Sequence, residues 1–153
     1  MVIDHYDTLL NFNKSSLNGA VALFSVGHSL FTHIAFSGRL PPDYQREAGL
    51  YGALVDNILS DCLILDVAEL TIAEDTAHHT LAFLLGLVLH SRGEVAFVAG
   101  GRRVNRGFLG NHFGSVAPIH RSLDEALDLR CRDRRQPSPG WVSGESARPQ
   151  KFS

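Results

Sequence analysis

The chain has 153 residues, the length of one ordinary domain, and at that size about two-thirds of the unfolded surface can be buried. Hydrophobic residues make up 44% of it and charged residues 20%, which are normal values for a globular protein. The two cysteines, Cys62 and Cys131, lie far apart and form no C-x-x-C pair, which argues against a disulfide framework and fits a reducing cytosol. No secretory signal is recognisable and the longest apolar run is about half a membrane span, so we expect a cytoplasmic protein.

Charge is unevenly distributed along the chain. Residues 130–153 carry six basic and two acidic side chains, whereas residues 1–129 carry eight basic and fourteen acidic ones. The acidic body argues against a nucleic-acid-binding face on the folded domain. The basic tail is rich in Arg, Pro, Ser and Gly, so we expect it to be disordered and solvated, with contact to an acidic partner as the alternative.

The first half of the chain predicts an arm, a hairpin and a helix. Residues 1–18 show no clean period and are expected to form a short helix or a loose N-terminal arm. Segments 19–26 and 30–37 are apolar and predict two strands, joined by a tight turn at Gly27. Leucine and isoleucine recur at every fourth position within residues 43–59, which predicts a helix there.

The second half predicts strands that alternate with helices. The apolar run C-L-I-L-D-V at 62–67 is typical of a strand buried on both faces. A helix follows over 76–91, with Asp75 placed to cap it. The remaining expected elements are a strand at 94–99, a short helix near 104–111, a strand at 116–120 and a capped helix at 122–129. This order indicates an α/β domain with a mostly parallel sheet.

The helix expected over 76–91 has more apolar residues than one face requires. The set expected to face the sheet is Leu81, Leu84, Leu85 and Val88, at positions i, i+3, i+4 and i+7. Phe83 and Leu87 lie on a different side of the same helix. We therefore predict that this pair is exposed and binds a partner or a second copy of the chain, with cover by the N-terminal arm or a neighbouring helix as the alternative.

Several segments together carry a family resemblance. The run C-L-I-L-D-V followed by A-E-L-T, the segment S-R-G-E-V-A-F-V-A-G and the ending F-G-S-V-A-P-I-H-R-S-L-D-E-A-L occur in this order, with S-G-R-L upstream at 37–40. In order and spacing they resemble the STAS domain, the family of bacterial anti-sigma-factor antagonists and of transporter cytoplasmic tails. The resemblance covers residues 19–129 and implies a mixed, mostly parallel sheet with about four helices packed on it.

One motif departs from the family pattern. The second helix of STAS domains usually opens with D-S-S-G, whose second serine is phosphorylated by a partner kinase. This chain has Glu74-Asp75-Thr76-Ala77, so Thr76 stands at the phosphorylated position and is the phosphorylation candidate. A phosphate there would be favoured by the helix dipole and would change a partner surface. The alternative is that Thr76 only helps to start the helix, and the loss of the glycine favours this alternative.

The resemblance implies a regulatory protein–protein interaction domain and not an enzyme. It would act in transcription regulation as an anti-sigma-factor antagonist that binds an anti-sigma factor or serine kinase. The expected partner-binding residues are Arg39, Glu74, Asp75, Thr76, His79, Phe83 and Leu87. The alternative is a non-switching subunit of a larger signalling or lipid-transport complex.

Other ligands find little support in the sequence. The eight histidines form no H-x-x-x-H pair, so we expect no metal, and we expect no other cofactor. Gly100-Gly101-Arg102-Arg103 lacks the Lys-Ser/Thr of a phosphate loop and predicts a strand-to-helix turn. We also expect no nucleic acid and no membrane insertion, while a homodimer stays open.

Overall fold

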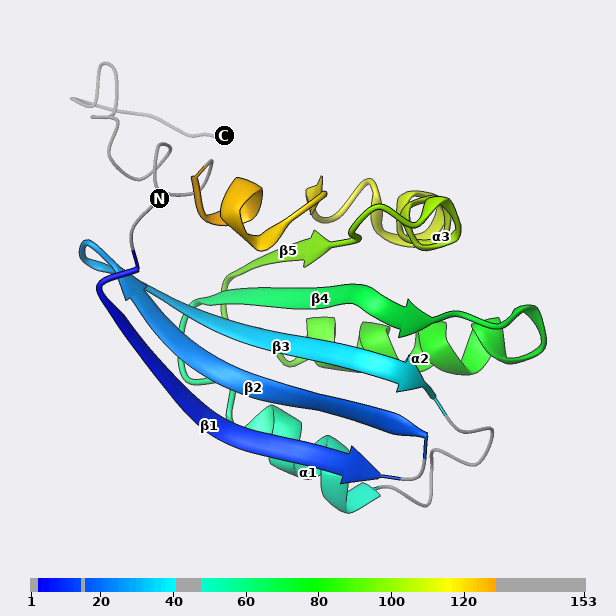
Figure 1. Ribbon diagram of the computed structural model, residues 1–153, viewed down its shortest axis with the longest axis horizontal. Helices are drawn as coiled ribbons and strands as arrows, with labels where there is room; N and C mark the ends of the chain where they lie inside the picture. Colours follow the sequence, from blue (N-terminus) through cyan, green and yellow to red (C-terminus); the bar gives the residue numbers. More distant parts are fainter. Residues whose placement is uncertain (1–2, 15, 41–47, 129–153) are drawn as a thin grey trace.

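The computed structural model describes residues 3–14, 16–40 and 48–128, which fold around one six-stranded sheet (Figure 1). The strands are β1 (His5–Lys14), β2 (Leu17–Val26), β3 (Ser29–Arg39), β4 (Cys62–Thr71), β5 (Glu94–Val98) and β6 (Ile119–His120). Their order in the sheet is the order in the chain. The first two pairings are antiparallel, because short turns join β1 to β2 and β2 to β3. The other three pairings are parallel, because connections that contain helices join the strands from β3 to β6. The predicted mixed, mostly parallel sheet is thus confirmed.

The expectation of a helix or loose arm before residue 19 was wrong. Residues 5–14 form the edge strand β1, which pairs with β2 from His5 opposite Ser25 to Lys14 opposite Leu17. The register shifts between Thr8 and Leu10, so one residue of β1 bulges out of the ladder. The bulge resets the alternation of polar and apolar residues, which is why the sequence shows no clean strand period here.

Among the described residues, four helical segments follow the hairpin. They are α1 (Ala48–Asp56), η2 with α2 (Glu74–Thr76 and Ala77–Leu89), α3 (Arg103–Phe113) and a last helix at 123–128. The predicted helix over 43–59 is described only from residue 48 onward, and the predicted tail at 130–153 lies outside the described residues. The predicted helices and the strands from residue 62 onward are found, with ends that differ by up to four residues where both ends are described.

The two faces of the sheet are covered differently. Helices α1 and α2 lie behind the sheet in Figure 1, and their buried leucines and Phe83 join a core that also includes α3. The other face carries a smaller core, in which Ala126 and Leu127 of the last helix pack near Phe24 and Ile64. Residues 62–65 of β4 are therefore buried on both faces, as their continuous apolar run predicted.

The last helix begins as predicted. The Ser122 hydroxyl accepts a hydrogen bond from the backbone N–H of Glu125 at 3.1 Å. The Glu125 carboxylate accepts one from the backbone N–H of Arg121 at 2.7 Å. The serine half of the capping box is thus confirmed, and the glutamate half reaches one residue further back than the usual pattern.

Candidate partner-binding surface

Three of the predicted partner-binding residues, Arg39, Glu74 and Asp75, lie together at the end of the sheet where β3 and β4 terminate. Because β3 and β4 are parallel, their carboxyl ends lie together, and the chain then runs from β4 through residues 72–76 into α2. We call residues 72–76 the β4–α2 loop. Arg39, at the end of β3, places Nη2 3.7 Å from Oδ1 of Asp75 in this loop. Glu74 is exposed beside them, so the structure brings Arg39, Glu74 and Asp75 into one polar surface.

The end of β4, which leads into this loop, accepts hydrogen bonds from side chains of α3 and its N-cap residue. Asn105 is buried, and its Nδ2 donates hydrogen bonds to the carbonyl oxygens of Val67 at 2.6 Å and Leu70 at 2.8 Å. Arg102 Nη1 donates a third bond to the Leu70 oxygen at 3.1 Å. Buried hydrogen bonds of this kind fix the position of the backbone, because releasing one leaves a desolvated carbonyl unpaired.

Asn105 and Arg102 were not predicted as site residues. A signal for Asn105 exists in the sequence, since it lies four residues before Leu109 and eight before Phe113, and all three are buried on one face of α3. Arg102 directly follows the turn at Gly100-Gly101. Gly100 has φ 70°, and a Cβ at position 100 would lie 2.7 Å from the Ala68 Cβ. This segment is therefore the predicted strand-to-helix turn, and one of its arginines binds a backbone carbonyl.

Thr76 is poorly placed for a kinase. The residue is 5% exposed, and its backbone N–H donates to the Ala73 carbonyl at 3.2 Å within the η2 turn. Its own carbonyl accepts a bond from the Thr80 hydroxyl at 3.3 Å. Asp75 does not cap α2 as predicted; Thr76 occupies the N-cap position and makes no side-chain capping bond. Little of the residue is therefore accessible to a kinase in this arrangement.

The prediction that Phe83 and Leu87 are exposed was wrong. Both are buried, together with Thr80 and Leu84, at positions i, i+3, i+4 and i+7. The Phe83 ring packs edge-on against Phe36 at 5.8 Å and Tyr51 at 5.9 Å between centroids. The buried stripe differs from the predicted one because Thr80 occupies the core position that was predicted for Leu81. The Thr80 hydroxyl can be buried there because it donates a hydrogen bond to the Thr76 carbonyl.

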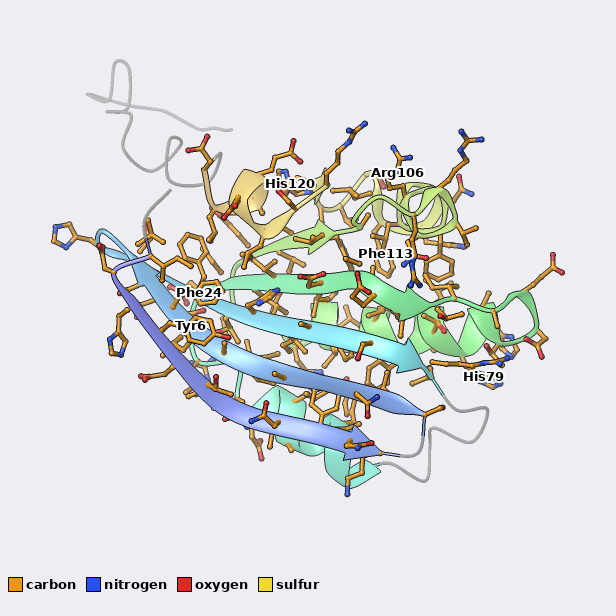
Figure 2. The ribbon with its side chains drawn as sticks, in the orientation of Figure 1. Tyr6, Phe24, His79, Arg106, Phe113 and His120 are labelled. Atoms are coloured by element: carbon orange, nitrogen blue, oxygen red, sulfur yellow. The ribbon has the colours of Figure 1, made fainter. Side chains whose placement is uncertain are left out.

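The rotation of α2 exposes other apolar residues instead. Leu85 is 43% exposed and Leu89 is 74% exposed. With His78 and Ala82 they follow positions i, i+4, i+7 and i+11, so the four form one line along the helix. We call these four residues the α2 outer face. It begins directly beside the β4–α2 loop, where the His79 ring lies 4.0 Å from that of His78 (Figure 2 labels His79).

Other kinds of site find no support within residues 3–14, 16–40 and 48–128. No group of three or more His, Cys, Asp or Glu side chains there could hold a metal ion. No helix among them is long and apolar enough to cross a membrane. A hollow of about 260 Å³ lies at the opposite end of the strands, lined by residues 28–30 and 59–61.

Comparison with known proteins supports the fold. No protein-family model and no curated protein sequence matches the chain. Among solved structures, an anti-sigma factor antagonist from Mycobacterium paratuberculosis is similar, with a TM-score of 0.50 and 17% sequence identity over 82% of this chain and 94% of that one. At this identity the likeness establishes architecture alone. The chain therefore has a STAS-like α/β fold, as its motifs predicted.

Proposed function

We propose that this protein is a non-enzymatic regulatory domain that binds an anti-sigma factor in the cytoplasm through the β4–α2 loop and the α2 outer face. One observation carries the proposal: an exposed polar loop and an exposed apolar helix face adjoin each other at the carboxyl edge of a STAS-like sheet. The similar structure is itself an anti-sigma factor antagonist. Binding of the anti-sigma factor would release a sigma factor and so regulate transcription.

The two parts of this surface suit different contributions to binding. Full burial of a leucine side chain contributes roughly 1.5–3 kcal/mol, so Leu85 and Leu89 are the residues from which a partner gains most affinity. Glu74 and Asp75 are charged and solvent-exposed, and rim charges of this kind act mainly on association rate and specificity. The partner we propose therefore presents an apolar patch with basic residues at one end.

The burial of Thr76 favours constitutive binding over a phosphorylation switch. Little of Thr76 is accessible to a kinase, and the D-S-S-G motif, whose second serine is phosphorylated in the family, is absent. This observation supports the second candidate function, a non-switching STAS subunit of a larger signalling or lipid-transport complex. Both candidates use the same surface and differ in the partner.

The test measures affinity for purified anti-sigma factors encoded in the same genome, by biolayer interferometry. We expect one of them to bind, and Leu85→Asp and Leu89→Asp to weaken binding at least tenfold, or about 1.4 kcal/mol. Leu59→Asp is the matched control, because Leu59 is 50% exposed and lies just before β4, at the end of the strands opposite the β4–α2 loop. Absence of binding to every anti-sigma factor would favour the subunit function. Equal loss with Leu59→Asp would refute the proposed surface.

A further inference from the structure

In the part of the chain that the structure describes, the outer side of the edge strand β1 is open. β1 is ten residues long, contains no proline, and pairs with β2 on one side only in the part of the chain described. A strand with one unpaired side presents a row of backbone donors and acceptors that can pair with another strand. Edge strands are often protected from pairing by shortness, proline, bulges or charged side chains; β1 has the bulge after Thr8 and a lysine at its end, but it is long and has no proline.

The pairing with β2 assigns each β1 side chain to a face. Tyr6 and Thr8 stand opposite Phe24 and Ala22, and Tyr6 stacks on Phe24 at 5.3 Å on the face toward the viewer in Figure 2. After the bulge, Asn11 and Asn13 return to that face. The opposite face, on which α1 packs, takes Asp7, Leu10, Phe12 and Lys14.

A groove runs beside this open edge on the helix side. It has a volume of about 550 Å³ and lies between the second half of β1 and helix α1. Its lining combines residues 10–14 of β1 with Gly49, Leu50 and Ala53 of α1. An added strand would therefore find backbone groups at the edge and a partly apolar space beneath it for every second side chain.

The sequence of β1 is complementary to itself across this edge. In an antiparallel pairing about a two-fold axis at Asn11, Leu10 stands opposite Phe12 of the second copy, and Thr8 opposite Asn13. The same register would place Asp7, which lies 2.9 Å from His5 within its own chain, opposite Lys14, so that two further ion pairs would form at symmetric positions. Every pair joins residues of one face, with the bulged residue left out of each strand. A two-fold axis makes such a patch isologous, as closed dimers require.

We propose that two copies of this chain associate through antiparallel pairing of their β1 strands in this register. The charge complementarity and the shared faces favour a second copy over an unrelated extended peptide. The inference does not depend on the proposed function, because the β4–α2 loop follows a strand three positions away in the sheet and stays exposed in such a dimer.

A charge swap tests the register. The mass of the full chain is measured by size-exclusion chromatography with light scattering from micromolar to high-micromolar concentration. We expect a dimer, and about a tenfold or larger rise in dimer dissociation constant for Asp7→Lys and for Lys14→Asp, because each single variant places like charges opposite each other at two positions. The double variant Asp7→Lys/Lys14→Asp should restore wild-type dimerisation. Asp124→Lys, an exposed position on the last helix, is the matched control.

Three results would overturn the proposal. A wild-type chain that stays monomeric throughout the range, including one that instead binds an extended peptide, excludes the second copy. A dimer that neither single variant weakens uses another surface. A double variant that stays monomeric shows that the register is wrong. Thermal unfolding of each variant confirms that it remains folded, since both side chains are exposed.

Discussion

Truncation of Phe83 should remove a large part of the free energy of unfolding of this domain. Phe83 is 5% exposed and packs on two aromatic rings, one from β3 and one from α1. Replacing a buried phenylalanine by alanine costs about 3–5 kcal/mol, from lost transfer free energy and the cavity left behind. The whole domain is expected to be stable by about 5–15 kcal/mol. With a urea m-value of about 2 kcal/mol/M, Phe83→Ala should lower the midpoint of urea unfolding by about 2 M.

The matched variant is Leu85→Ala on the same helix. Leu85 is 43% exposed, so its truncation should cost below about 1 kcal/mol, partly offset by the higher helix propensity of alanine. Both variants are followed by circular dichroism in urea, with the m-value checked for two-state behaviour. Similar midpoints for the two variants would refute the assignment of Phe83 to the core, and a larger loss for Leu85→Ala would reverse the orientation of α2.

Two further predictions concern the loop and its support. Thr76→Glu should lower the free energy of unfolding by about 2 kcal/mol or more, because a carboxylate would be buried. Thr71→Glu, at an exposed position, should change the free energy of unfolding little. Equal thermal stability of the two variants would show that Thr76 is accessible to a kinase. Asn105→Ala should cost about 1–3 kcal/mol, because the Val67 carbonyl loses its bond to the side chain. Asn111→Ala on the exposed side of α3 is its control in the same urea assay, and equal costs would contradict the supporting role of Asn105.

Continuous burial made part of the fold predictable from sequence. A strand covered on both faces must be apolar at every position, so residues 62–65 of β4 carry an unambiguous signal. The hairpin of β2 and β3 was predictable because Gly27, with φ 62°, interrupts two long apolar segments. β1 was missed because it has one exposed edge and one bulge, so that neither continuous burial nor strict alternation marks it.

The orientation of α2 was not predictable for a different reason. Leucine, valine and phenylalanine occur all around this helix, so periodicity alone permits more than one buried stripe. The choice depends on tertiary contacts: the rings of Phe36 and Tyr51 meet Phe83, and Gly86 leaves room for the Tyr51 hydroxyl, which would lie 2.5 Å from a Cβ there. Such contacts join residues about 32 to 47 positions apart in sequence, which no local pattern records.

The support beneath the β4–α2 loop bears on how the partner surface could be regulated. A switch that works by phosphorylation needs a segment with two arrangements of similar free energy. Here the end of β4 is bound to α3 by Asn105 and Arg102, and Thr76 lies buried where α2 begins. Opening this segment would break buried hydrogen bonds, at a cost of about 1–3 kcal/mol for each group left unpaired. A surface held in one arrangement would bind the proposed partner without an ordering cost, and the concentrations of the two proteins would then control binding.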